Sequence, residues 1–400
     1  MPYNSRTNNR PSRGRSSSFS GGGGGRSSRR PSKENIHASR FIKAASIPTE
    51  ENTYTPTHQF SDFAIDELLQ VNLRTKGIIT PSPIQDQSIP AGLNGQDIIG
   101  IANTGTGKTI AFAIPLLDRL IADRNSRALI MAPTRELAKQ IEDECREIAK
   151  GSGLTGALLI GGAPMGPQLR DLRGKPRIVI GTPGRIKDHM ERGSLDLSTH
   201  NIVVLDEVDR MLDMGFVADM REILAELNTA RQSFFFSATM DPKVSSLINE
   251  FSHDPITVSV KTGDTTDTVE QNVVRYGSRN EKMEKLHDIL ADQSLKVLVF
   301  DETQRSVERL SDELNQRGFR VDAIHGGKSQ GARQRALNRF KANDISILVA
   351  TDVAARGIDV SDITHVINYT TPQSYSDYVH RIGRAGRAGR VGYALTFIEG

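Results

Sequence analysis

Short apolar, β-branched runs alternate with amphipathic segments of helical period over most of the chain, from about Phe60 onward. Residues 136–150 are typical of the helical segments, with apolar side chains on one stripe. Runs that are apolar throughout are characteristic of parallel strands buried on both faces, and their alternation with helices builds parallel sheets. The sequence therefore predicts the α/β class. The strand-like runs are residues 97–102, 128–132, 157–162, 177–181, 201–205, 233–237, 272–276, 296–300, 320–324, 346–350, 365–369 and 393–397.

Length and a polar interruption predict two such domains in tandem. A chain of 400 residues exceeds the size at which a single hydrophobic core stops growing. The segment 261–269 is polar and turn-rich, and the alternation restarts after it. We expect a first domain over 47–260, a linker over 261–269 and a second domain over 270–400.

Residues 1–46 differ in composition from the rest of the chain. They are rich in Ser, Gly and Arg, and eight Arg and two Lys against one Glu give them a net charge of +9, whereas the whole chain carries only +3. Such a segment buries too little apolar surface to fold alone, so we expect a disordered basic tail. It either binds nucleic-acid phosphates without choosing a sequence or is only a solvated extension. Five consecutive glycines argue against a transit peptide.

Two features of the sequence restrict the compartment in which the protein is expected. The single cysteine, Cys145, excludes an intramolecular disulfide, and we expect an inert thiol in a reducing compartment. No apolar run reaches the roughly 20 residues that span a bilayer, and no secretory signal is recognised at the N-terminus. We expect a cytoplasmic protein.

The stretch ANTGTGKT, residues 102–109, fits a phosphate-binding loop. A strand-like run precedes it and a helical segment follows, although Ala102 stands where the pattern has a glycine. The two glycines of the loop let backbone N–H groups point at phosphates, and the following helix N-terminus adds a favourable dipole. Lys108 supplies a positive charge and the Thr109 hydroxyl can bind Mg²⁺. The nucleotide-binding residues assigned here are Thr104, Gly105, Thr106, Gly107, Lys108 and Thr109.

Three carboxylates follow the apolar run 202–205 directly: Asp206, Glu207 and Asp209. They repel one another at the end of a buried strand unless positive charge lies among them. If this strand ends at the same sheet edge as the phosphate loop, a Mg²⁺ ion at Asp206 supplies that charge. Glu207 can then orient or deprotonate the attacking water, and Asp209 can tie neighbouring loops together.

The phosphate loop and the acidic motif, together with the further motifs described below, resemble those of the DEAD-box RNA helicases of superfamily two, of bacterial type. The motifs occur in the order found in that family, and the resemblance extends from about Phe60 to Phe397. The resemblance implies two tandem RecA-like parallel-sheet domains, with ATP and Mg²⁺ in the cleft between them and RNA across both. RNA would be contacted mainly at its backbone, with little sequence preference. The acidic tetrad is Asp-Glu-Val-Asp, with Val208 where the family has alanine. The chain ends at Gly400, where the family commonly adds a closing helix.

The resemblance also implies how the nucleotide is recognised. The stretch GIITPSPIQ resembles the adenine-reading motif, in which the Gln85 carboxamide can donate to and accept from the base edge. Phe60 corresponds to the isolated upstream aromatic residue. Ile78 stands where the family usually stacks an aromatic ring on adenine, so stacking should be weaker. Asp359 resembles the ribose contact, with Gly357 beside it.

The remaining motifs imply residues for coupling, catalysis and RNA binding. Asp209, Ser237 and Thr239 resemble the residues that couple hydrolysis to strand separation. Arg384 and Arg387 resemble arginine fingers that neutralise transition-state charge, with His380 in the same network. The implied RNA-binding residues are Pro133, Thr134, Arg135, Gly162, Thr182, Gly184, Arg185, Gln330, Arg333, Thr351 and Asp352.

These features predict an ATP-dependent RNA helicase, an RNA-dependent ATPase that separates short RNA duplexes. One alternative is an ATP-gated RNA clamp or chaperone with little turnover. The intact Lys108, Glu207, Arg384 and Arg387 argue against it. The other is a DNA translocase, against which Gln85 and Phe60 argue. Protein partners are not predicted by the sequence.

Overall fold

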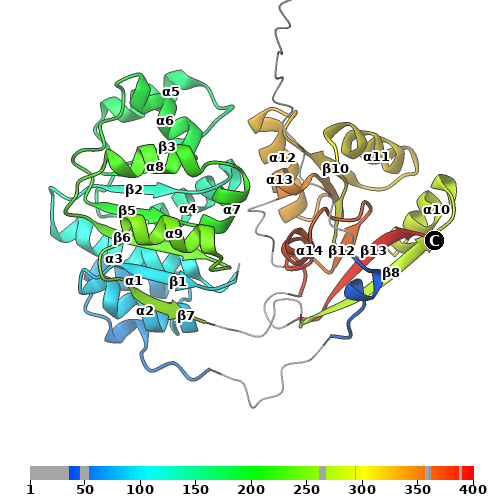
Figure 1. Cartoon of the computed structure of the whole chain (residues 1–400), viewed down its shortest axis with the longest axis horizontal. Helices are drawn as coiled ribbons and strands as arrows, with labels where there is room; N and C mark the ends of the chain where they lie inside the picture. Colours follow the sequence, from blue (N-terminus) through cyan, green and yellow to red (C-terminus); the bar gives the residue numbers. More distant parts are fainter. Residues whose placement is uncertain are drawn as a thin grey trace, which may run out of the picture.

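The computed structural model describes residues 36–45, 54–103, 105–260, 267–292, 294–355, 360, 362–386 and 390–400. Within them the chain forms two parallel sheets, each covered by helices on both faces (Figure 1). The predicted fold of two tandem parallel-sheet α/β domains is therefore confirmed. None of the helices in the described ranges is long and apolar enough to cross a membrane.

The first sheet has seven strands in the order β3-β4-β2-β5-β6-β1-β7, and every pair is parallel. Its two faces bury different side chains of the same strand, because successive side chains alternate. In β5, for example, Ile202 and Val204 face one core whereas Val203 and Leu205 face the other. The strands are β1 (Ile98–Ile101), β2 (Ala128–Met131), β3 (Gly156–Leu159), β4 (Ile178–Gly181), β5 (Ile202–Leu205), β6 (Gln232–Ser237) and β7 (Ile256–Ser259).

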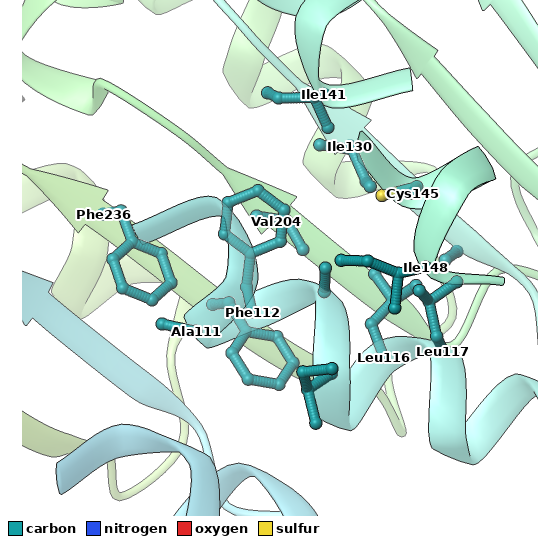
Figure 2. Packing of buried hydrophobic residues seen from close by; sticks show 14 of the residues in the cluster. Ala111, Phe112, Leu116, Leu117, Ile130, Ile141, Cys145, Ile148, Val204 and Phe236 are labelled. Carbon is teal, nitrogen blue, oxygen red and sulfur yellow. The ribbon is translucent and has the colours of Figure 1, made fainter. Parts of the chain in front are cut away.

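Helices α1 to α4 contribute to the core on one face of this sheet, and α5 to α9 to the core on the other. Helix α4 shows why: Ile141, Cys145 and Ile148 form one apolar stripe that packs on the core beside Ile130 (Figure 2). Burial raises the pKa of the Cys145 thiol to about 12, consistent with an inert thiol. The helices are η3 (Phe60–Asp62), α1 (Glu67–Thr75), α2 (Pro83–Leu93), α3 (Lys108–Ala122), α4 (Arg135–Ile148), α5 (Met165–Arg173), α6 (Pro183–Glu191), α7 (Val208–Asp213), α8 (Val217–Ala225) and α9 (Pro242–Phe251).

The second sheet has six parallel strands in the order β10-β11-β9-β12-β13-β8. Helices α10 and α11 contribute to the core on one face, and α12, α13 and α14 to the core on the other. The strands are β8 (Val269–Tyr276), β9 (Val297–Phe300), β10 (Val321–Ile324), β11 (Ile347–Ala350), β12 (His365–Asn368) and β13 (Gly392–Glu399). The helices are α10 (Arg279–Leu290), α11 (Gln304–Gln316), α12 (Gln330–Lys341), α13 (Asp352–Ala355) and α14 (Tyr375–Ile382).

Residues 36–45, which we name the anchor segment, differ from the sequence-based prediction of a tail over 1–46. They contain the short helix η1 (Ala38–Phe41) and a bridge to β8, and Phe41 belongs to a core of the second domain. Figure 1 shows this blue segment beside β8. Folding is possible here because the segment packs on a preformed surface instead of burying its own. The rest of the predicted tail, 1–35 and 46, lies outside the described residues.

The domain boundaries differ slightly from those predicted. Strand β8 already begins at Val269, within the predicted linker 261–269, and residues 261–266 lie outside the described part. The edge strand β7 was not predicted. Within the described part of the chain it pairs with β1 alone, and two of its four residues are exposed, so it lacks a continuous apolar run.

Candidate active site and RNA interface

The phosphate loop joins β1 to α3 as the sequence predicts. Gly107 adopts a left-handed backbone (φ +91°) just before Lys108 begins the helix, a conformation that glycine tolerates best. Lys108 is 6% exposed, and its Nζ donates to the carbonyl of Ala102 at 2.8 Å. Its ammonium therefore lies at the end of the strand, beside the loop. Gly105 also has a positive φ, whereas Thr104 lies outside the described residues.

A cavity of about 390 Å³ extends from this loop. Phosphate-loop residues, the acidic motif and a side chain from the second domain line it together, so the cavity is completed only when the two domains meet. Its lining residues are Lys76, Ile78, Gly105, Gly107, Lys108, Thr109, Ile110, Leu137, Gln140, Glu144, Asp206, Glu207 and Arg384.

Asp206 and Glu207 lie buried at the end of β5, 3% and 5% exposed. Strand β6 alone separates β5 from β1, so both loops meet at one sheet edge. Glu207 has a left-handed backbone, with φ of +55°, which is strained for a residue with a side chain. Such strain is common at functional sites. Here it lies at the residue expected to act on water.

The two carboxylates have opposite electrostatic surroundings. Burial raises the pKa of Asp206, and despite the nearby Lys108 it is raised to about 6, with Glu207 adding repulsion. Burial also acts to raise the pKa of Glu207, but Arg210, Lys108 and Arg384 outweigh it and hold that pKa below its usual value. Glu207 is thus kept ionised.

Arg210 is a functional candidate that the sequence interpretation missed. It is 2% exposed, and its Nη1 donates to Glu207 Oε2 at 3.0 Å. Part of the positive charge required among the three carboxylates is therefore supplied by the chain itself. The available signal was its spacing, because Arg210 lies three residues after Glu207 at the start of a helix.

Gln85 connects the predicted base-reading motif to the phosphate loop. Its Oε1 accepts from the Ser82 N–H at 2.8 Å, and its Nε2 donates to the Gly107 carbonyl at 3.0 Å. A carboxamide has two donor hydrogens and two acceptor lone pairs, so one of each remains for an adenine edge.

Phe60 is buried rather than open to the cavity. Its ring packs edge-on against Phe63 at 5.7 Å between centroids, and its N–H donates to Ile79. It belongs to the core beneath the base-reading motif, whereas Ile78 lines the cavity.

Asp209 links the acidic motif to the loop after β6. One carboxylate oxygen accepts from the N–H groups of Ala238 and Thr239, at 3.1 and 3.0 Å, and from the Thr239 hydroxyl at 3.2 Å. Ser237 is buried at the end of β6, and its hydroxyl has no partner among the described residues. Asp209 therefore ties the acidic motif to this loop.

The second domain contributes its arginine motif through α14 and the turn that follows. Arg384 is 4% exposed and reaches the cavity that contains Glu207, and His380 adds to the charge around that carboxylate. Arg381 instead holds Asp352 through two hydrogen bonds, at 2.5 and 2.7 Å. Both carboxylate oxygens of Asp352 therefore accept hydrogen bonds from within its own domain. Gly357, Asp359 and Arg387 lie outside the described residues.

The residues predicted to bind RNA include three arginines that lie close together across the two domains. Burial lowers the pKa of Arg135, and the charges of Arg333 and Arg185 lower it further. Arg333 of α12 pairs with Glu136 of α4 at 2.8 Å, both nearly buried, and Gln330 Nε2 donates to the same carboxylate oxygen at 3.4 Å. The ion pair and this hydrogen bond join the domains beside the repelling arginines.

The other predicted RNA-binding residues lie mainly at turns and helix starts of both domains. Thr134 caps α4 by accepting from Leu137, and Thr182 precedes α6. Gly162 has a φ of +71°, and a Cβ there would lie 2.2 Å from Arg135 Nη1, so the glycine makes room for that arginine. Pro133 precedes α4, Gly184 lies in the first turn of α6, and Thr351 follows β11.

Two family models match the chain: DEAD/DEAH box helicase over residues 82–248 and helicase conserved C-terminal domain over 281–389. An ATP-dependent RNA helicase CshA of Listeria monocytogenes is 42% identical over 344 residues, which cover 85% of this chain and 66% of the relative. A DEAD-box ATP-dependent RNA helicase CshA of Bacillus subtilis is also 42% identical, with coverage of 86% and 70%. The chain spans about two thirds of the length of these relatives.

Solved structures give the same assignment. A DEAD box protein from the hyperthermophile Methanococcus jannaschii is 39% identical, with a TM-score of 0.50 and coverage of 85% of this chain and 93% of that chain. S. cerevisiae Dbp5 bound to RNA and ADP BeF3 is 27% identical, with a TM-score of 0.76 and coverage of 85% and 89%. The chain belongs to the DEAD/DEAH box helicase family.

Proposed function

We infer that this chain, an ATP-dependent RNA helicase of the DEAD-box family, uses hydrolysis in the cavity between its domains to separate short RNA duplexes locally. One observation carries this inference: Lys108, Glu207 and Arg384 line a single cavity although they come from different domains. A phosphate-binding cation, a carboxylate that can act on water and an arginine from the opposite side are the parts that phosphoryl transfer requires.

In this proposal Lys108 exchanges its bond to the Ala102 carbonyl for the terminal phosphates of ATP. Glu207, held ionised by Arg210, accepts a hydrogen bond from the attacking water and orients it. Arg384 stabilises the charge that develops as the phosphoryl group leaves.

Thr109 and Asp206 would hold Mg²⁺. Their oxygens line the cavity, and the raised pKa of Asp206 marks a buried carboxylate short of positive charge. No group of three or more His, Cys, Asp or Glu side chains suited to a metal occurs in the described ranges. Thr109 and Asp206 would give Mg²⁺ two protein ligands, and the ion commonly adds phosphate and water to one or two of these. When bound, it would neutralise phosphate charge.

Adenine recognition is assigned to Gln85, through the donor and acceptor that its two internal hydrogen bonds leave over. Because Nε2 also holds the Gly107 carbonyl, the base-reading motif and the phosphate loop would respond to the nucleotide together. Val208 is fully buried, so the valine in this acidic tetrad fills core space and leaves the carboxylates unaltered. We regard this tetrad as a variant of the family's acidic motif in a protein of bacterial type.

RNA would lie on the arginine cluster of Arg135, Arg185 and Arg333, whose mutual repulsion favours an anionic ligand. RNA and ATP together would stabilise the joined arrangement of the domains, because each ligand contacts both. The similarity to the yeast protein bound to RNA and ADP BeF3, with a TM-score of 0.76, supports this view.

The test compares phosphate release with and without RNA, and with DNA in its place, alongside displacement of a fluorescent strand from a short RNA duplex. We expect RNA-stimulated turnover and strand release. Tight ATP-dependent RNA binding without phosphate release would favour the clamp, and equal stimulation by DNA would favour the translocase. A cytoplasmic location and an RNA-binding role for the residues before 36 remain predictions.

A further inference from the structure

The proposed function does not account for the anchor segment, residues 36–45. Phe41 is 1% exposed and its ring meets Tyr378 of α14 edge-on, 4.7 Å between centroids. The guanidinium of Arg40 lies 3.7 Å from the centre of the Tyr375 ring, on the same helix. Two aromatic side chains of α14 are thus held by consecutive residues from the far end of the sequence.

Backbone and charge contacts fix the segment in register. Lys43 exchanges two backbone hydrogen bonds with Gln271 of β8, at 3.0 and 2.8 Å. Gln271 Oε1 in turn accepts from the Tyr378 hydroxyl at 3.0 Å, so the bridge reaches α14 a second time. Lys43 Nζ pairs with Asp267 at 2.6 Å. β8 is the edge strand of its sheet, and the segment pairs with it at Gln271.

The two faces of α14 carry different groups. Tyr375 and Tyr378, three residues apart, lie on the face toward the anchor segment and the core. His380 lies on the other face, and it lines a small cavity with Arg381, Arg384 and Arg210 of the first domain. The helix therefore stands between the anchor segment and the catalytic cleft.

We propose that the anchor segment is a positioning element for hydrolysis: it fixes α14 from behind, and thereby the place of Arg384 opposite Glu207. Phe41 is the principal positioning residue, because it fills the space beside Tyr378 and is not among the residues that line the cavity. A second path runs just before β8, where the Thr268 hydroxyl donates to the carbonyl of Gly386, two residues after Arg384, at 2.9 Å. This inference rests on the proposed role of Arg384.

The experiment measures steady-state ATPase of full-length Phe41→Ala over ATP and RNA concentrations. Loss of the buried ring lets α14 shift, and a misplaced transition-state contact lowers the rate steeply, so we expect maximal turnover to fall about tenfold. The Michaelis constant for ATP and the half-saturating RNA concentration should stay within about twofold, since the binding contacts are intact. Phe41→Leu, which refills most of the space, should restore most of the turnover.

Ile42→Ala is the matched control, because that neighbouring side chain is 55% exposed; its turnover should equal that of wild type. Turnover is expressed per binding-competent molecule, counted by titration with a non-hydrolysable ATP analogue and RNA. If Phe41→Ala folds poorly, Arg40→Gln, which removes only the contact with Tyr375, should lower turnover in the same way.

Unchanged turnover per competent Phe41→Ala molecule would overturn the proposal and leave Phe41 a role in stability alone. An equal loss in Ile42→Ala would also overturn it, because the effect would then not come from the buried ring. The wild-type measurement distinguishes failure of the positioning role from failure of the proposed function. Without RNA-stimulated hydrolysis in wild type the proposed function fails, whereas an active wild type matched by Phe41→Ala refutes only the positioning role.

Discussion

The ion pair between Glu136 and Arg333 should control how readily the two domains join. Both side chains are nearly buried, 3% and 7% exposed, in the joined state. Glu136→Leu would leave the Arg333 guanidinium buried beside Arg135 without its carboxylate. Removing one partner of a buried pair costs about 3–5 kcal/mol, so the joining equilibrium should weaken about a hundredfold or more. Separated domains let water solvate the arginine, so they escape this cost.

The assay is energy transfer between one dye on each domain, titrated with RNA at a saturating non-hydrolysable ATP analogue. The RNA concentration for half-maximal transfer should rise about a hundredfold in Glu136→Leu. The control is the same change in an Arg333→Met background, where no guanidinium is left unpaired and Glu136 is itself the buried charge without a partner, so its replacement should restore joining instead of weakening it. An equal rise of the half-maximal RNA concentration in both backgrounds would refute the reasoning, because the cost would then not come from the ion pair.

Four further predictions concern the cavity, the nucleotide, acid stability and the tail. Glu207→Gln should retain ATP and RNA binding but lose phosphate release in single-turnover assays; wild-type rates would remove its role on water. Wild type should hydrolyse ATP far faster than GTP through Gln85, and equal rates would contradict that assignment. Burial lowers the pKa of His200 to about 4, so the folded state resists a proton that the unfolded chain accepts below about 6.5. The unfolding free energy should therefore fall by up to about 3 kcal/mol as pH drops between those values, measured by urea unfolding, and His200→Gln should flatten this dependence. A chain beginning at Ile36, which keeps the anchor segment, should show a shallower salt dependence of RNA binding than the full chain; identical slopes would make the tail a solvated extension.

The strands and both catalytic loops could be predicted because their signals are local. A strand such as β5 is buried on both faces, so it must be apolar throughout, and a phosphate loop needs glycines at fixed spacing. The acidic residues after β5 were also recognisable, because three carboxylates after an apolar run are costly without a partner. Edge strand β7 gave no such signal, because only one side of it is paired.

What could not be predicted depends on residues that are distant in sequence. Phe41 is surrounded by polar and basic residues, and only the surface around Tyr378 makes it a core residue. The pairing of Glu136 with Arg333 requires the two domains to be placed against each other. From the sequence alone, Arg210 would be taken for an ordinary solvated charge, and only the burial of α7 shows that it lies in the interior. In each case local composition is a poor guide to what the fold brings together.

The anchor segment has a consequence for how this protein is made. Phe41 leaves the ribosome early, but Tyr378, its partner, is synthesised more than 300 residues later. At about 5–20 residues per second the segment waits on the order of tens of seconds while the whole first domain is made and can fold. The second domain is therefore completed by a segment that was made long before it. Its final packing step should follow the synthesis of Tyr378, so the arginine helix would reach its working position late.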